Sequence, residues 1–213
     1  MIERILPAGV VTASAYDDPA EAKLLPEEEP AVARAVDKRR REFTTVRWCA
    51  RRALAGLGLP PVPITRGDKG APRWPDGVVG SMTHCDGYRA AAVARAADLA
   101  ALGIDAEPHG PLPDGVLEAV AREEELAMLD GLGRTAPGVH WDRLLFSAKE
   151  SVYKAWFPVT GRWLGFEDAS LTFDPGGTFR AAILVGDSPF ASFDGRWAAG
   201  GGLAVTAIAV PAG

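Results

Sequence analysis

The stretch Leu99-Ala-Ala-Leu-Gly-Ile-Asp-Ala-Glu107 lies near the middle of the 213-residue chain and joins an apolar run to a pair of acidic residues. Leu99 to Ile104 has the length and composition of a β-strand, and polar residues end it. In an extended chain, residues i and i+2 point to the same face about 6.6 Å apart, so Asp105 and Glu107 can face one ion. Magnesium suits such a pair because it prefers hard oxygen ligands and leaves positions open for substrate phosphates. The alternative is that two acidic residues simply begin a loop.

The segments before this stretch predict a long helix, a long loop and a second strand. Apolar residues recur at spacings of three and four from Pro30 to Leu57, which is the pattern of an amphipathic helix. Between Arg66 and Gly80 the chain is dense in glycine, proline and aspartate, which indicates a long loop. Long loops in compact folds are often functional. Tyr88 to Val93 is a short apolar run of strand length.

The segments after the central stretch alternate between helices and strands. Helices are predicted from Asp114 to Leu129, with Asp114 as the N-cap, and from Trp141 to Phe157. Four strands separated by Gly-rich turns are predicted in the remaining chain: Ala169 to Phe173, Phe179 to Val185, Gly195 to Ala199 and Leu203 to Val210. This order and mixture of elements predict an α+β fold with a natural midpoint near residue 106.

Composition and charge argue against several classes of protein. Hydrophobic residues make up 47% of the chain, enough for a sizeable core. The net charge of −5 argues against general nucleic-acid binding, so an anion site must be local; seven of the fifteen residues from Lys38 to Arg52 are basic. No apolar stretch has the length of a membrane span or the form of a secretory signal. Cys49 and Cys85 fit neither a disulfide framework nor a zinc site, which indicates free thiols in a reducing cytoplasm.

A second group of polar residues lies on the helix predicted from Trp141 to Phe157. At 100° per residue, Glu150 and Lys154 lie opposite the apolar side of this helix. A Glu–Lys pair four residues apart is also an ordinary stabiliser of exposed helices, worth about 0.3–0.5 kcal/mol. Phe146 and Phe157 flank the same face, however, and aromatic side chains beside a charged pair favour a cleft.

The basic helix and a Thr-His pair supply candidate anion ligands. Arg39 lies in the core-facing apolar stripe and Arg47 beside it, and an arginine near a core requires an anionic partner. Phosphate matches the planar fork of the guanidinium group. Thr83 and His84 follow the long loop, although a lone histidine is more often structural than functional. His84 and Cys85 cannot form a thiol dyad on a strand, because neighbouring side chains point to opposite faces.

Five motifs of the chain occur in a distinctive order and spacing. They are the basic helix from Lys38 to Arg47, Trp74-Pro-Asp-Gly77, Ser81-Met-Thr-His84, Gly103-Ile-Asp-Ala-Glu107 and Phe146-Ser-Ala-Lys-Glu-Ser-Val-Tyr-Lys154. Together they resemble the Sfp-type 4'-phosphopantetheinyl transferases over most of the chain, and the last two motifs are the specific ones. Trp141-Asp-Arg143 and Trp163-Leu-Gly-Phe166 resemble the subgroup of actinobacterial members and enterobactin synthetase component D.

The resemblance implies two pseudo-symmetric α/β halves, residues 1–106 and 107–213, with coenzyme A in the cleft between them and one site in a monomer. Asp105, Glu107 and Glu150 correspond to the magnesium-binding acids, and Glu150 also to the base for the acceptor serine. The catalytic set that this implies is Glu150, Lys154 and Asp105. The positions that correspond to the coenzyme A-binding set are Arg39, Arg47, Arg66, Lys69, Thr83, His84, Lys149 and Lys154.

The reaction implied by the resemblance is Mg²⁺-dependent transfer of the 4'-phosphopantetheine of coenzyme A to a serine of an apo carrier protein, with release of adenosine 3',5'-bisphosphate. Such a transfer requires an in-line nucleophile and charge neutralisation at the pyrophosphate. The expected partners are acyl and peptidyl carrier domains, as found in polyketide synthases and nonribosomal peptide synthetases, with no nucleic acid and no membrane. The alternatives are a non-catalytic module that binds coenzyme A or a nucleotide, and a Mg²⁺-dependent phosphohydrolase.

Overall fold

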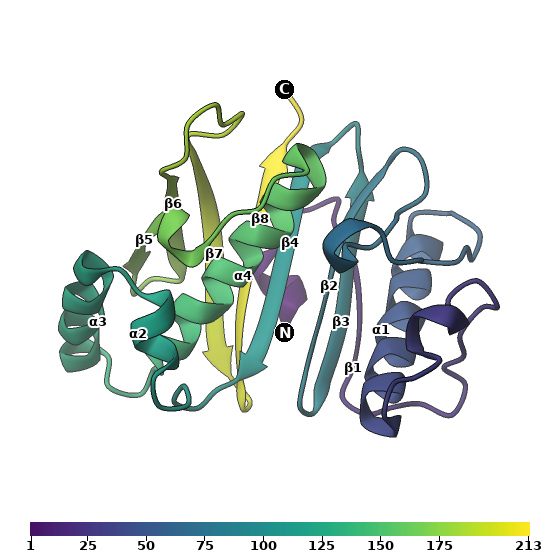
Figure 1. Cartoon of the computed structure of the whole chain (residues 1–213), viewed down its shortest axis with the longest axis horizontal. Coiled ribbons are helices and arrows are strands. Elements are labelled where there is room, and N and C mark those ends of the chain that lie inside the picture. Colours follow the sequence, from purple (N-terminus) through teal and green to yellow (C-terminus); the bar gives the residue numbers. More distant parts are fainter.

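The stretch around Asp105 forms an edge strand of a five-stranded antiparallel sheet in the computed structural model, which describes residues 1–213 (Figure 1). The strand order is β4-β8-β7-β6-β5. The strands are β4 (Leu99–Pro108), β5 (Ala169–Asp174), β6 (Thr178–Ile183), β7 (Ser192–Gly200) and β8 (Leu203–Pro211). Asp105 pairs with Thr206 of β8, so the middle of the chain lies beside its C-terminal strand.

A second antiparallel sheet contains three strands in the order β1-β3-β2. They are β1 (Val11–Ala15), β2 (Val78–Cys85) and β3 (Tyr88–Arg95). The central strand β3 is buried from its first residue to its seventh. Its alanines allow this, because small side chains let other elements pack closely on both faces.

The two sheets meet along β2 and β4, which are not joined by a backbone ladder. Side-chain hydroxyls bridge them instead: the Ile104 amide donates to Ser81 Oγ at 3.0 Å, and the Ala106 amide donates to Thr83 Oγ1 at 3.1 Å. All four residues are buried. Because a buried amide without a partner is costly, these two bonds align β2 with β4.

Each sheet is covered by one long helix, α1 (Asp37–Gly56) on the three-stranded sheet and α4 (Trp141–Thr160) across β4 and β8. α4 approaches β4 closely because Gly103 has no side chain. A Cβ atom at Gly103 would lie 2.1 Å from the carbonyl oxygen of Ser151. α4 ends at Gly161, whose φ of 64° is left-handed and favours glycine.

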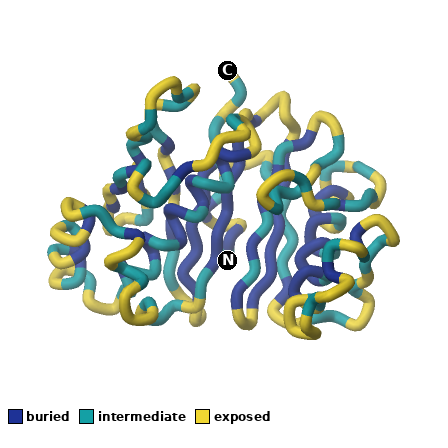
Figure 2. Tube along the Cα trace, in the orientation of Figure 1, coloured by how far each residue is buried: buried dark blue, intermediate teal, exposed yellow.

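Buried residues concentrate in the strands and on the inward sides of the two long helices (Figure 2). One cluster of 14 buried residues draws on both sheets, for example Ala92 of β3, Ile104 of β4 and Val205 of β8. The N-terminal 3-10 helix η1 (Ile2–Ile5) adds its two isoleucines to this cluster. The two sheets therefore share a hydrophobic core.

The helix predicted from Pro30 begins later in the structure. Glu29–Val32 forms the 3-10 helix η2, and Val36, in an extended conformation, is the N-cap of α1. Val36 is 74% exposed and so does not extend the apolar stripe. Glu28, which is fully buried, accepts two hydrogen bonds from Arg51 Nη1, so the chain folds back along α1 instead of prolonging it.

The helix predicted from Asp114 to Leu129 is divided into α2 (Val116–Val120) and α3 (Glu123–Thr135). Gly115, and not Asp114, is the N-cap of α2, and Ala121 ends it in an extended conformation. The buried carboxylate of Glu125 accepts hydrogen bonds from the amides of Arg122 and Leu171, both at 2.8 Å. The helix is therefore interrupted because Glu125 contacts β5. The spacing of apolar residues along the helix does not predict this contact.

The predicted α+β fold is confirmed. Trp141 starts α4 as expected, and the four C-terminal strands occur with ends shifted by a few residues. β1 was not predicted, and β2 begins at Val78, inside the predicted loop. The expected boundary near residue 106 falls inside β4, and the division into halves stays a prediction.

No helix of the chain combines the length and the apolarity that crossing a membrane demands.

Candidate active site

A cavity of about 230 Å³ opens where α1, the loop before β2, β2 and α4 converge. Seven of the residues expected in the site line it: Arg39 and Arg47 from α1, Arg66 and Lys69 from the loop, His84 from β2, and Glu150 and Lys154 from α4. Six of the seven carry basic side chains. Concentrating basic groups at the wall of a narrow cavity favours an anionic ligand.

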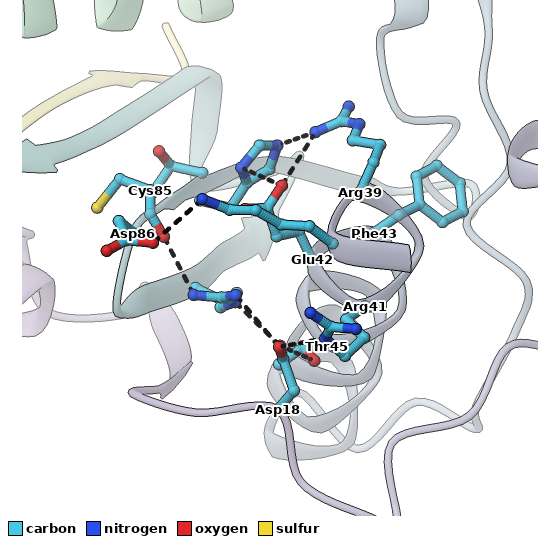
Figure 3. A network of polar contacts seen from close by, with 12 residues as sticks. Asp18, Arg39, Arg41, Glu42, Phe43, Thr45, Cys85 and Asp86 are labelled. Carbon is cyan, nitrogen blue, oxygen red and sulfur yellow. Dashed lines mark hydrogen bonds and ion pairs between the residues drawn. The ribbon is translucent and has the colours of Figure 1, made fainter. Parts of the chain in front are cut away.

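A polar network at one end of α1 includes Arg39 and Glu42 (Figure 3), and both residues contact His84. Arg39 Nη1 donates to His84 Nε2, and Glu42 Oε2 lies 3.8 Å from His84 Nδ1. A ring that accepts at Nε2 carries its proton at Nδ1, facing Glu42. Burial and the charges of Arg39 and Lys154 lower the pKa of His84 to about 4, so the ring is neutral near pH 7.

The same network anchors α1 to the strands. Asp18 lies beside Thr45 and Arg41 of α1 (Figure 3); it accepts a hydrogen bond from Thr45 at 2.7 Å and forms an ion pair with Arg41. Asp18 also forms an ion pair with Arg89 of β3. Arg89 also donates to the carbonyl oxygen of Cys85 at the end of β2. These contacts fix the position of α1, which carries Arg39 and Arg47 of the cavity wall.

Arg47 is buried although no carboxylate lies within ion-pair distance of it. Its Nε donates to the carbonyl oxygen of Ile64 at 2.9 Å, and its Cζ lies 3.2 Å from the centroid of the Phe43 ring. Burial lowers the pKa of Arg47 to about 9, and the neighbouring Arg66 and Arg39 act in the same direction. An anion in the cavity would relieve this unfavourable charge burial.

The loop before β2 turns sharply to place its two basic residues in the cavity wall. Lys69 has a φ of 53° and Gly70 a φ of 84°. The left-handed φ of Gly70 favours glycine, and a Cβ atom there would lie 3.0 Å from Arg66 Nη2, so the side chain of Arg66 would have to shift.

Asp105 is buried at the end of the seam between the sheets, and its two carboxylate oxygens have different surroundings. Oδ1 accepts hydrogen bonds from Lys154 Nζ at 2.6 Å and from Thr83 Oγ1 at 3.1 Å. Oδ2 is buried and has no hydrogen-bond partner. Burial would lower the pKa of Lys154, but the charges of Asp105 and Glu150 outweigh it and raise that pKa, so Lys154 stays charged.

Glu107 and Glu150, the other two acids expected to bind metal, differ in their surroundings: Glu107 has an ion-pair partner and Glu150 has none. Glu107 Oε2 lies 3.2 Å from Arg143 Nη1, while burial and the charge of Asp105 raise the pKa of Glu107 to about 7. Glu150 faces the cavity without an ion-pair partner. Burial raises the pKa of Glu150, Lys154 opposes this shift, and Asp105 adds to it.

The three acids do not form a metal cluster on their own, since no group of three or more His, Cys, Asp or Glu side chains is arranged to hold an ion. Their chemistry still suits Mg²⁺, which is commonly held by one or two carboxylates together with substrate phosphates. The orphaned Oδ2 of Asp105 is a hard oxygen donor in need of a partner. The residues present therefore fit a Mg²⁺ ion that binds with a phosphate ligand.

Two residues that the resemblance assigned to the coenzyme A site lie outside this cavity. Thr83 is 3% exposed and contacts Asp105 and the Ala106 amide. Lys149 is also 3% exposed and forms an ion pair with Glu125 at 2.8 Å. Burial lowers the pKa of Lys149, and Glu125 counteracts this.

A second cavity of about 220 Å³ adjoins the first on the other side of Glu150. Its wall is more apolar and includes Trp163, Leu164 and Phe166, and Lys149 also lines it. Glu150 and Tyr153 line both cavities. Sequence reasoning missed Tyr153, although its spacing of three from Glu150 places it on the same helix face.

Sequence reasoning also missed Ser81, and it did not identify Glu42 and Arg143 as partners of His84 and Glu107. Each of these contacts joins residues more than twenty positions apart. No local pattern indicates them.

Comparison with protein families gives two matches that together span most of the chain. Residues 27–94 match the 4'-phosphopantetheinyl transferase N-terminal domain, and residues 101–208 match the 4'-phosphopantetheinyl transferase superfamily.

Three similar proteins match along almost their full length. The 4'-phosphopantetheinyl transferase Svp of Streptomyces mobaraensis is 60% identical, over 100% of this chain and 90% of its own length. The 4'-phosphopantetheinyl transferase Npt of Nocardia iowensis is 53% identical, over 98% of this chain and 99% of its own. The 4'-phosphopantetheinyl transferase PptT of Mycobacterium tuberculosis is 51% identical, over 98% and 97% respectively.

Proposed function

Because this chain belongs to the 4'-phosphopantetheinyl transferase superfamily and is a transferase of that type, we propose that it moves the phosphopantetheine arm of coenzyme A to a serine of apo carrier proteins. The other product is adenosine 3',5'-bisphosphate. The observation that carries this proposal is the cavity in which Glu150 and Lys154 face a wall of basic side chains, with Asp105 behind them.

The two adjoining cavities suit the two parts of coenzyme A. The basic cavity, with Arg39, Arg47 and Arg66, offers hydrogen-bond donors to the phosphates of the nucleotide. The more apolar cavity, with Trp163 and Leu164, offers a wall for the pantetheine arm. The pyrophosphate between these two parts then lies beside Glu150, which lines both cavities.

Asp105, Glu107 and Glu150 are the residues we propose to hold Mg²⁺. The Oδ2 atom of Asp105 and the carboxylate of Glu150 are available to it, whereas Glu107 must share its carboxylate with Arg143. A bound Mg²⁺ supplies charge neutralisation at the pyrophosphate and positions its oxygens.

Glu150 and Lys154 supply the proton transfers. In the reaction, the serine oxygen forms a bond to the phosphorus on the pantetheine side and the bond from that phosphorus to the bridging oxygen breaks. Glu150 accepts the serine proton, because it is the carboxylate of the basic cavity that has no ion-pair partner. Lys154, held in its charged form, stabilises or protonates the departing bisphosphate.

The proposal extends to the oligomeric state, the partners and the location of the enzyme. Residues of one chain line both cavities, which supports a monomer with one site. The proposed partners are acyl and peptidyl carrier domains of polyketide or nonribosomal peptide synthesis, and the proposed location is the cytoplasm.

Mass spectrometry of carrier proteins tests the proposal. With coenzyme A and Mg²⁺, an apo carrier from a panel of acyl and peptidyl types should gain one phosphopantetheine, and a chelator should prevent the gain. Glu150→Gln should lower kcat by about 10²–10³-fold, because it removes the base and a charge at the site. The control Glu118→Gln, on the exposed side of α2, should transfer normally.

Two other outcomes would replace the proposed function. Binding of coenzyme A by calorimetry without a mass gain on any carrier would identify a non-catalytic binding module. Release of phosphate from nucleotides in the absence of a carrier would identify a phosphohydrolase.

A further inference from the structure

Lys149 and Glu125 form the most deeply buried ion pair of the molecule, and Lys149 directly precedes Glu150. Lys149 Nζ lies 2.8 Å from Glu125 Oε2, and the two side chains are 2% and 0% exposed. Nζ also donates to the backbone carbonyl oxygens of Phe166 at 2.7 Å and Ala169 at 3.2 Å. An ammonium group has three N–H donors, so these three acceptors use its full capacity.

The carboxylate of Glu125 is also fully engaged. Oε1 accepts from the Leu171 amide, and Oε2 accepts from the Arg122 amide and from Lys149. Removing one partner of a buried ion pair leaves an uncompensated charge, which is strongly unfavourable. Lys149 therefore cannot turn toward a phosphate without leaving Glu125 buried and unpaired.

The pair ties α3 to two segments that line the second cavity. Glu125 lies in the first turn of α3, Lys149 lies in the middle of α4, and Phe166 and Ala169 lie before and at the start of β5. Phe166 and Ala169 line this cavity together with Glu150. The distance between Glu150 and that wall consequently depends on the Lys149 contacts.

We propose that Glu125 and Lys149 are positioning residues that hold Glu150 and the wall of the second cavity in place for transfer, without the charged group of either contacting the phosphates of coenzyme A. This inference rests on the proposed transferase function and departs from the expectation that Lys149 lies at the pyrophosphate. A misplacement of a reacting group by about 1 Å can cost about a hundredfold in rate, so a buried pair of this kind affects catalysis from a distance.

Single and double variants test the pair. Glu125→Gln and Lys149→Met should each lower kcat about ten- to a hundredfold, while the KM and the calorimetric Kd for coenzyme A change less than about twofold. The double variant should lose no more than the worse single variant, because both substitutions disrupt the same pair. Glu124→Gln, on the exposed neighbour of Glu125, is the matched control and should keep the wild-type kcat.

Two kinetic results would overturn the inference. A large rise in the Kd for coenzyme A in Lys149→Met but not in Glu125→Gln would show that Lys149 contacts the substrate. Wild-type kcat in both variants, with only the melting temperature lowered, would show that the pair is structural and does not position Glu150.

NMR of the lysine ammonium groups in the wild-type protein covers the case in which the variants do not fold. Addition of coenzyme A should shift the Lys154 signal and leave the Lys149 signal in place. A comparable shift at Lys149 would contradict the inference, whether or not transfer is observed. Lack of transfer by the wild type toward every carrier, with the Lys149 signal unchanged, would count against the proposed function alone.

Discussion

Thr83 lies outside the basic cavity, yet its hydroxyl contacts the carboxylate on which the proposed reaction depends. Oγ1 accepts a hydrogen bond from the Ala106 amide and donates one to Asp105 Oδ1, both at 3.1 Å. One hydroxyl thus aligns the two sheets and orients the carboxylate. With Oδ1 occupied, Oδ2 is the oxygen left for a ligand.

Replacing Thr83 by valine should destabilise the protein and slow transfer. The substitution keeps the shape of the side chain but leaves the buried Ala106 amide without its acceptor, which costs about 1–3 kcal/mol. Urea denaturation and the carrier assay measure the two effects. Thr83→Ser should retain both stability and activity, and Thr172→Val on the exposed side of β5 is the control. Wild-type stability and kcat in Thr83→Val would contradict this role.

His84 should titrate far below an ordinary histidine. The pKa of His84 is lowered from 6.5 to about 4, first by burial and then by the charges of Arg39 and Lys154. The unfolded chain therefore binds a proton at this residue between about pH 6.5 and 4 while the folded protein does not. Stability should be complete above pH 6.5 and fall as the pH falls through this window.

NMR titration of the His84 ring measures the folded pKa directly, and denaturation at several pH values measures its consequence. His84→Gln should show a weaker loss of stability between pH 6.5 and 4 than the wild type. A ring titration midpoint near 6.5 in the ligand-free protein would refute the proposed environment.

At the scale of elements, the packing of α4 on β4 brings Glu150 and Lys154 to Asp105. The contact depends on Gly103, because a Cβ there would lie 2.1 Å from Ser151 O and 2.8 Å from the Ala155 amide. Both obstacles are backbone atoms of a helix, which cannot move aside as a side chain can.

Gly103→Ala should therefore push α4 away from the sheet, with a loss of at least about 1–3 kcal/mol, the usual cost of overpacking a core. It should also separate Lys154 from Asp105 and lower kcat. Gly133→Ala is the matched control: no atom lies within 4 Å of its Cβ, and alanine favours the interior of α3 by about 0.5–1 kcal/mol. Chemical denaturation should give opposite signs for the two variants, and equal effects would contradict the close contact at Gly103.

At the scale of the whole molecule, one hydrophobic cluster belongs to both sheets. It includes Ala92 of β3, Leu102 of β4 and Ala207 of β8, together with Ile2, which is fully buried. Because residues of both sheets form this cluster, each sheet needs the other to bury its apolar surface. The active-site cavity, which is lined by β2 of one sheet and by α4 on the other, therefore depends on their joint folding.

The whole chain should consequently unfold in one cooperative transition. Ile2→Ala, far from the cavity, should lower the stability of the entire molecule by about 2–5 kcal/mol without splitting that transition. Calorimetry and urea denaturation followed by tryptophan fluorescence test this. Two separate transitions, in the wild type or in the variant, would show that the halves fold independently.

Local patterns in the sequence predicted several helices and strands, the placement of Glu150 and Lys154, and the family. The four-residue spacing of Glu150 and Lys154 placed both on one face of a helix, and the apolar run before Asp105 identified β4. The order of the motifs identified the family, which the comparisons confirm. These features depend on residues close together in the chain, whose relative positions are set by the geometry of a helix or a strand.

The environments of the individual side chains required the folded chain. Asp105 meets Lys154, Glu107 meets Arg143, and Lys149 turns into the core toward Glu125. Other long-range contacts, from Glu125 to Leu171 and from Glu28 to Arg51, separate α2 from α3 and fold the segment before α1 back along it. Each contact joins partners that are more than twenty residues apart, and a buried charge takes the partner that folding brings within reach. The spacing of residues along the chain does not predict which distant residue will become that partner.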